Sequence, residues 1–136
     1  MPELPDTADT PFVRTDFASE KAWNDLVAEV GRESEDGFKA YISIINDPKF
    51  DGCDPGVLAR LRPGMRGHAV LFVADRVTFA NPDHAILCIN LSAPENRFRV
   101  IPAQLWSVEN NLSLANMDWE DFASAVDSDG VLRGFG

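Results

Sequence analysis

The chain has 136 residues, 45% of them hydrophobic, and a formal net charge of −10. This composition fits one folded domain and excludes a disordered chain, which would combine high charge with low hydrophobicity. The charge argues against direct binding to nucleic acids or anionic membranes, because like charges repel over a Debye length of about 8 Å.

The negative charge is unevenly distributed along the chain. Residues 1–36 carry a net −7 and residues 102–136 a net −5, whereas residues 37–101 carry +2. A partner with a basic surface, such as a nuclease or a basic peptide, would be steered toward such a protein. The alternative is that the acidity only maintains solubility.

Residues 1–11 are polar and rich in proline, which predicts a flexible lead-in followed by a single globular domain over 12–136. The N-terminal residues hold neither a basic region nor an apolar run, so we expect no signal peptide. No stretch approaches 18 apolar residues, which predicts no membrane span, and we expect a cytoplasmic location.

The first predicted elements are a strand at 12–15 and a helix that ends at Gly31. Asp16 and Ser19 are both candidates for the residue that caps the start of this helix. The helix is amphipathic, because apolar residues recur at intervals of three and four along one stripe: Ala22, Trp23, Leu26, Val27 and Val30.

Aromatic and β-branched residues at 38–45 favour a second strand. A short helix is predicted to begin at Asp54 and Pro55, since proline is tolerated at the first helical position. Pro63 and Gly64 are predicted to end it. Its apolar side is formed by Val57, Leu58 and Leu61.

The run from Ala69 to Ala74 is almost entirely apolar. A strand of this kind is normally buried on both faces, which predicts the centre of the sheet. Residues 76–80 are interpreted as an extension of the sheet, and residues 85–91 as another buried strand.

The C-terminal part predicts a short strand at 98–101 and a helix over 103–110. Residues 112–115 are interpreted as either a short strand or an extended link. Asp118 is predicted to cap a last helix, which buries Trp119, Phe122, Ala123 and Val126. Together these elements predict an α/β domain, with α+β as the alternative: a mixed sheet of about five strands with three to four helices packed on it.

Motifs for catalysis or metal binding are not found, and we predict no catalytic residue, no cofactor and no metal. The sequence has no GxSxG, no CxxC pair and no glycine-rich phosphate loop, and PGMRG has the wrong spacing for one. Cys53 lies between Asp51 and Asp54, which would raise rather than lower a thiol pKa. His68 and His84 stand before consecutive apolar strands and lack a further ligand that the sequence would place beside them.

Asp75 and Arg76 form the first candidate site, because they follow the most apolar strand directly. In α/β sheets, ligands bind at the carboxyl ends of strands. The alternative interpretation is an ordinary ion pair or turn.

The segment 106–122 is the second candidate, because it brings aromatic and amide side chains close together. Such groups suit recognition surfaces. The alternative is structural, since asparagines tolerate left-handed backbone and often end helices, which would account for Asn110 and Asn111. The candidate binding residues here are Trp106, Glu109, Asn110, Asn111, Asn116 and Trp119.

Four segments of the chain resemble a family of small acidic domains of unknown function, associated with actinobacteria and some fungi. The segments are VRTDF (13–17), SEDGFKAYISIINDP (34–48), LFVADRVT (71–78) and the most specific, residues 106–135. The resemblance implies a stand-alone intracellular protein of about this length, and it implies no activity, cofactor or catalytic residue.

The acidic termini and the missing catalytic set predict a non-enzymatic protein-interaction module, such as an immunity-type or inhibitor protein that binds a basic partner. The alternative is a small enzyme or ligand-binding domain, with a pocket formed by Asp75, Arg76 and an amide from Asn110 or Asn111. A third possibility is a homo-oligomeric domain with an exposed apolar patch.

Overall fold

A computed structural model describes residues 2–60 and 67–135 and contains a six-stranded mixed sheet with the order β2-β1-β3-β4-β5-β6. The pairs β1–β2, β1–β3 and β5–β6 are parallel, whereas β3–β4 and β4–β5 are antiparallel. The predicted mixed α/β domain is therefore confirmed. The strands are β1 (Thr10–Arg14), β2 (Ile42–Ile45), β3 (Val70–Ala74), β4 (Ile86–Asn90), β5 (Arg97–Val100) and β6 (Val131–Leu132).

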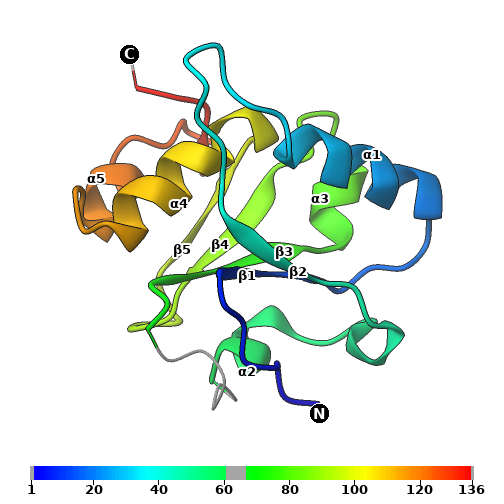
Figure 1. The fold of residues 1–136 in the computed structure, drawn as a ribbon. Helices are drawn as coiled ribbons and strands as arrows, with labels where there is room; N and C mark the ends of the chain where they lie inside the picture. The colour runs from blue at the N-terminus through cyan, green and yellow to red at the C-terminus, as the bar shows by residue number, and fades with distance from the viewer. Residues whose placement is uncertain (1, 61–66, 136) are drawn as a thin grey trace.

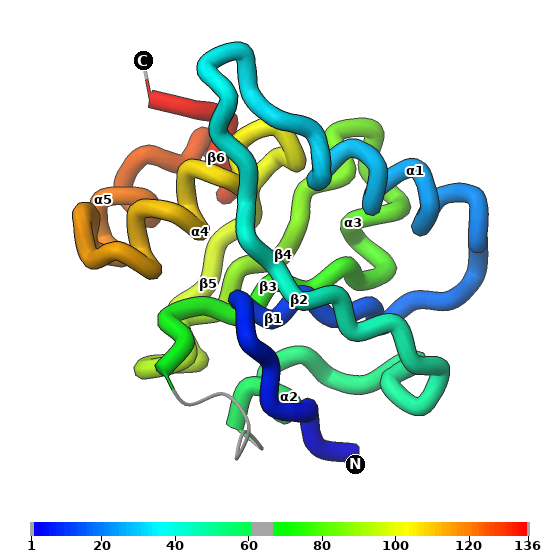
Figure 2. Tube along the Cα trace, viewed as in Figure 1, coloured from blue at the N-terminus to red at the C-terminus, as the bar shows by residue number. Residues whose placement is uncertain are grey.

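Helices cover both faces of the sheet unequally, as Figures 1 and 2 show. One face carries α1, α3, α4 and α5, and the other carries α2 with a 3₁₀ turn, η1 (Pro48–Phe50). A second 3₁₀ turn, η2 (Pro102–Gln104), leads directly into α4. The helices are α1 (Glu20–Val30), α2 (Pro55–Arg60), α3 (Arg76–Ala80), α4 (Leu105–Ser113) and α5 (Trp119–Ala123).

The central strand β3 confirms the prediction for residues 69–74. All five of its residues are fully buried. Val70, Phe72 and Ala74 join the core beneath α1, α4 and α5, while Leu71 and Val73 join the core beneath α2. A strand covered on both faces has no solvent side, which explains why its sequence does not alternate.

The first helix also begins and ends as predicted. Ser19, rather than Asp16, caps α1, because the Ser19 side chain accepts a hydrogen bond from the backbone N–H of Ala22 at 3.1 Å. Trp23, Leu26 and Val30 are its buried residues.

The second strand is shorter than predicted, since β2 spans only Ile42–Ile45. Residues 38–41 are held by side chains of α4 instead of by a neighbouring strand. Asn110 Nδ2 donates to the carbonyl of Lys39 at 3.0 Å, and the Tyr41 N–H donates to Glu109 Oε1 at 2.7 Å. We call residues 38–41 the crossing segment.

Residues 76–80 form helix α3, so their interpretation as an extension of the sheet is wrong. Asp75 caps this helix: its Oδ1 accepts from the Thr78 N–H at 3.0 Å, while the Asp75 N–H donates to Thr78 Oγ1 at 3.2 Å. This reciprocal capping box outweighs the strand preference of Val77, Thr78 and Phe79.

Both interpretations of residues 112–115, a short strand and an extended link, are also wrong, because α4 continues to Ser113 and Leu114 follows as its C-cap. The strand β6 was not predicted. Leu61 and the helix end predicted at Pro63–Gly64 lie outside the described residues. The N-terminal segment holds one buried side chain, Leu4, and β1 begins at Thr10. Over the described ranges, no helix has the length and apolar character needed to cross a membrane.

Candidate functional site

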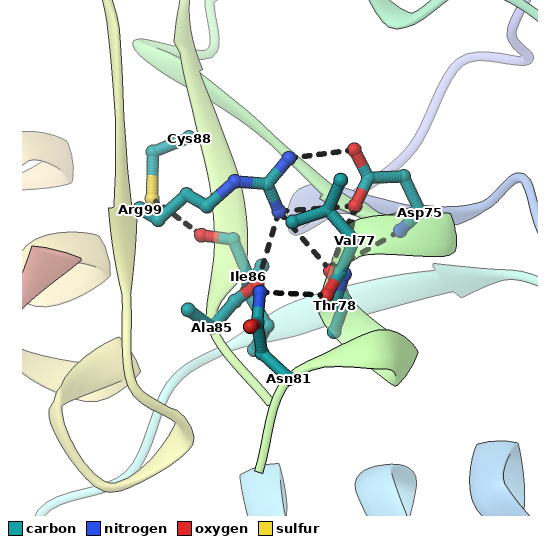
Figure 3. A network of polar contacts seen from close by, with 8 residues as sticks. All are labelled: Asp75, Val77, Thr78, Asn81, Ala85, Ile86, Cys88 and Arg99. Atoms are coloured by element: carbon teal, nitrogen blue, oxygen red, sulfur yellow. Dashed lines mark hydrogen bonds and ion pairs between the residues drawn. The ribbon is translucent and has the colours of Figure 1, made fainter. Parts of the chain in front are cut away.

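Asp75 is engaged by Arg99 from the strand two places away in the sheet, as Figure 3 shows. Arg99 Nη1 donates to Asp75 Oδ1 at 3.0 Å, and Arg99 Nη2 donates to Asp75 Oδ2 at 2.8 Å. Thr78 Oγ1 donates to the same Oδ1 at 3.0 Å, and Arg99 Nη1 also donates to the carbonyl of Ala85 at 3.1 Å. Both carboxylate oxygens of Asp75 are therefore occupied by protein groups.

The environment of Asp75 favours its charged form. Burial by itself raises the pKa of this carboxyl, but hydrogen bonds from Arg99 and Thr78 and the charge of Arg99 together bring the pKa below its ordinary value of 3.8. The Asp75 and Arg99 side chains are only 17% and 19% exposed. Arg76, the predicted partner, is exposed at the start of α3. The ion pair between Asp75 and Arg99 thus connects β3 and α3 to β5 and has a structural role.

A cleft of about 340 Å³ lies beside this pair, bordered by Arg97, Phe98, Arg99 and Asp129. Neither Asn110 nor Asn111 is among its lining residues. The structure therefore does not bring together the Asp75, Arg76 and asparagine amide of the alternative prediction.

Glu109 is a buried carboxylate, 4% exposed, that connects α4 to two other parts of the fold. It accepts hydrogen bonds from the Tyr41 N–H at 2.7 Å, Ser113 Oγ at 2.6 Å and Thr10 Oγ1 at 3.4 Å. Asn110 Nδ2 donates to it at 3.1 Å as well as to the crossing segment. These two candidate residues position the crossing segment on α4.

Asn111 and Asn116 belong to the end of α4. Asn111 Nδ2 donates to the carbonyl of Ser107 at 2.9 Å, and the carbonyl of Asn111 accepts from the N–H groups of Asn116 and Met117. Asn116 itself is exposed. The interpretation of Asn110 and Asn111 as helix-ending residues is wrong, because α4 continues to Ser113 and the left-handed residue after it is Ala115, with a φ of 56°.

The two candidate tryptophans contact different surroundings. Trp106, at the start of α4, stacks on Phe38 of the crossing segment, with ring centroids 4.9 Å apart and planes inclined by 12°. Trp119, on α5, packs against Phe98 of β5 at 4.7 Å. Only Trp106 borders the groove described next.

A groove of about 520 Å³ lies between the C-terminal end of α1, the loop after it, and η2 with the start of α4. We call it the acidic groove. Its charged lining residues are Glu29, Arg32, Glu33, Glu35 and Asp36, and the indole of Trp106 supplies an aromatic wall.

The loop that carries these acids has a defined backbone. Ser34 N–H donates to the carbonyl of Phe38 at 2.7 Å, and Ser34 Oγ accepts from the Phe38 N–H at 3.0 Å. Gly37 completes the turn with a φ of 83°, a left-handed value that favours glycine. Among residues 2–60 and 67–135, Glu33, Glu35 and Asp36 have no ion-pair partner, so their charges face solvent.

Arg14 is a fully buried arginine that the sequence analysis missed. At the carboxyl end of β1, its Nε donates to the carbonyl of Asp16 at 2.9 Å, and its Nη1 donates to Glu20 Oε1 at 2.8 Å and Asn46 Oδ1 at 3.3 Å. Its guanidinium carbon lies 4.1 Å from the ring centre of Phe17. These contacts fix the loop that enters α1.

The histidines and cysteines are separated from one another. His68 Nε2 lies 2.9 Å from the carbonyl of Thr7, whereas His84 Nδ1 lies 4.0 Å from Glu29. Cys88 is buried in β4, and this burial raises its thiol pKa well above the ordinary value. Within the described part of the chain, no three His, Cys, Asp or Glu side chains are grouped as metal ligands.

Comparisons with known proteins identify a family but no activity. Among curated proteins, no sequence matches this chain. A family model described as a domain of unknown function, DUF6924, matches residues 9–135. This match confirms the resemblance to a family of uncharacterised domains. The matched residues include every strand and helix of the described fold. The chain therefore belongs to the DUF6924 family.

Proposed function

We propose that this protein is a non-enzymatic interaction module whose acidic groove binds basic side chains of a partner protein, as an immunity-type or inhibitor protein would. The observation that carries the proposal is a groove lined by four acidic residues, Glu29, Glu33, Glu35 and Asp36, against one arginine, Arg32, together with Trp106. The protein's net charge of −10 would accelerate the encounter with a basic surface.

The chemistry of the groove suits arginine in particular. A guanidinium group can stack on an aromatic face while its N–H groups donate to carboxylates. Trp106 and the Phe38 ring stacked on it provide a rigid aromatic surface, and the neighbouring acids provide acceptors. Single exposed ion pairs contribute about 0–1 kcal/mol, so affinity requires several of these contacts together.

The region around Asp75 supports a ligand-binding function less well. An acid–base or ligand-binding carboxylate needs a free oxygen, whereas Arg99 and Thr78 already donate to both oxygens of Asp75. A ligand at Asp75 would have to compete with these hydrogen bonds, whereas binding in the acidic groove leaves them intact.

Binding of a fluorescently labelled octa-arginine peptide, followed by anisotropy at several salt concentrations, tests the proposal. The triple variant E33Q/E35Q/D36N removes three groove charges and is expected to weaken binding by about tenfold, a loss of about 1.4 kcal/mol. The matched control, E3Q/D6N/E95Q, removes the same charge from exposed positions outside the groove.

The comparison of the two triple variants decides the outcome. A selective loss in the groove variant, with a reduced salt dependence, supports the acidic groove as the binding site. Equal losses in both variants would show that the peptide responds only to net charge, and no measurable binding by the wild-type protein would overturn the proposal.

A further inference from the structure

Strand β2 leaves one edge of the sheet open. It is the terminal strand, paired on one side with β1, and no strand of the described residues pairs with its other side. The crossing segment continues β2 toward its N-terminal side, and Figure 1 shows this stretch running across the front of the molecule. The backbone open to a further strand is that of Ile42–Ile45, because Phe38, Lys39 and Tyr41 of the crossing segment already bond through their backbone to Ser34, Asn110 and Glu109.

The side chains of this stretch alternate between the two faces of the sheet. Ala40 belongs to the core beneath α1 and α4, Ile42 packs against that core, and Ile44 is paired with Phe12 of the same core. Ile45 belongs to the opposite core, and Lys39 Nζ lies 5.7 Å from the ring centre of Tyr41. The alternation shows that the backbone stays extended beyond the four residues that pair with β1.

The two ends of the sheet differ in how they are protected. Strand β6 has only two residues and is followed by Arg133, which forms ion pairs with Asp83, Asp127 and Asp129. Short, charged edges resist pairing with other chains.

Strand β2, in contrast, contains neither a charged residue nor a proline. Ile44 of β2 is 44% exposed, and the crossing segment next to it adds the exposed side chains of Phe38 (47%), Lys39 and Tyr41 (58%). An open, apolar edge of this kind is a site for strand addition.

The open edge leads to the acidic groove. Phe38 stands at the N-terminal end of the extended stretch and stacks on Trp106, which forms the aromatic wall of the groove. Consider a partner strand that lies along β2 and packs its apolar side chains against Ile42 and Ile44. The following residues of that partner strand, on the same face, would then reach the acidic groove.

We infer that an extended, basic segment of a partner protein adds as a further strand to the β2 edge and places an arginine or lysine in the acidic groove. This inference rests on the proposed function and specifies the form of the partner. The backbone edge would supply affinity through main-chain hydrogen bonds, while the groove would select the basic side chain.

Charge favours a basic partner over a second copy of this chain. A symmetric pairing of two β2 edges would bring together two chains of net charge −10. An extended basic segment meets the same apolar edge with complementary charge.

Amide hydrogen exchange tests the inference with a capped octapeptide of alternating arginine and valine. Strand addition is expected to slow exchange of the backbone amides of β2, Ile42–Ile45 within residues 38–45, by about tenfold at saturation, because amides in stable hydrogen bonds exchange only after opening. Arg99 and Val100 of β5, which already pair with strands on both sides, serve as the internal reference.

Two N-methylated versions of the peptide separate strand addition from simple charge attraction. Successive N–H groups of a strand point to opposite edges, so methylating all valines blocks one edge and methylating all arginines blocks the other. One version is expected to bind about tenfold more weakly than the other, although both have the same charge and composition.

The outcomes distinguish the inference from the proposed function. Equal binding of both methylated peptides, without protection of residues 38–45, would overturn strand addition while leaving the acidic groove as a binding site. No binding of the arginine–valine peptide would overturn the inference, and the octa-arginine experiment then decides the proposed function separately. Concentration-dependent protection of residues 38–45 in the protein alone, with a dimeric mass by light scattering, would identify a second copy as the occupant.

Discussion

Arg99 holds Asp75 with both of its terminal nitrogens, at 3.0 and 2.8 Å, although Arg99 lies on β5 and Asp75 follows β3, with β4 between these two strands. This two-pronged ion pair joins the cap of α3 to β5 across the sheet. Together with the hydrogen bonds from Thr78, the ion pair lowers the pKa of Asp75. The contribution of the ion pair to stability therefore depends on pH.

Asp75→Asn is expected to lower the free energy of unfolding at pH 7 by about 1–3 kcal/mol, because it leaves the mostly buried Arg99 without its charge partner. Since the folded-state pKa of Asp75 lies below its unfolded value, the stabilisation is present above about pH 4. It is lost as the pH falls through the lower folded-state pKa. Urea unfolding at pH 7 and pH 3 should therefore show the wild type and the variant converging in acid.

The control for this experiment is Asp6→Asn, which alters an exposed carboxylate of the N-terminal segment. It should leave the stability at pH 7 nearly unchanged. A difference between wild type and Asp75→Asn that stays constant over this pH range would contradict the assigned role of the ion pair.

Glu109→Ala is expected to release the crossing segment from α4, because the Tyr41 N–H and Ser113 Oγ lose their acceptor. We expect a loss of about 1–3 kcal/mol in the free energy of unfolding and faster hydrogen exchange at Tyr41. Asn116→Ala, which changes an exposed residue of the same region, is the control. Unchanged exchange at Tyr41 would show that the segment is held by other contacts.

Arg14→Met retains much of the aliphatic volume of arginine but removes its hydrogen bonds to Asp16, Glu20 and Asn46. We expect a loss of about 2–4 kcal/mol, because the variant leaves the Asp16 carbonyl without its buried donor and disorders the entry to α1. Arg14→Lys should recover only part of this loss, since an ammonium group cannot reproduce the fork of a guanidinium. Thermal unfolding would measure both, and equal stability of Arg14→Met and wild type would contradict the assigned role.

Trp106→Ala and Trp119→Ala are expected to have different effects. Trp106 borders the acidic groove, so its removal should weaken octa-arginine binding by about fivefold, the size of one exposed cation–π contact. Trp119 packs on Phe98, so its removal should mainly reduce the melting temperature. Anisotropy and thermal unfolding of both variants check the pair, and equal losses of binding would contradict this separation.

Local sequence patterns were sufficient where a single strong signal determines the structure. The unbroken apolar run ending at Ala74 predicted a strand buried on both faces, and the stripe through Trp23 and Leu26 predicted α1. Residues 76–80 were assigned wrongly because their side chains favour strands. The capping box between Asp75 and Thr78 decided the structure there, and such a box occupies only four residues.

The candidate site was harder to predict because its parts come from distant segments. Glu33 and Trp106 border the same groove, yet only the packing of α1 against η2 brings them together. The clustering of acidic residues in 29–36 was the available sequence signal for this groove, but the same clustering is equally typical of a solvent-exposed loop. Arg14 gave a weaker signal still, because a single arginine at a strand end is ordinarily exposed.

The parallel pairing of β6 with β5 has a consequence for synthesis on the ribosome. Between them the chain passes through η2, α4 and α5, so β5 is translated about thirty residues before the strand that covers its outer side. Until β6 joins the sheet, its lateral strands are β2 and the longer β5, instead of β2 and the two-residue β6. Emergence of Val131 and Leu132 therefore ends the period in which the β5 side can pair with a neighbouring chain on a polysome.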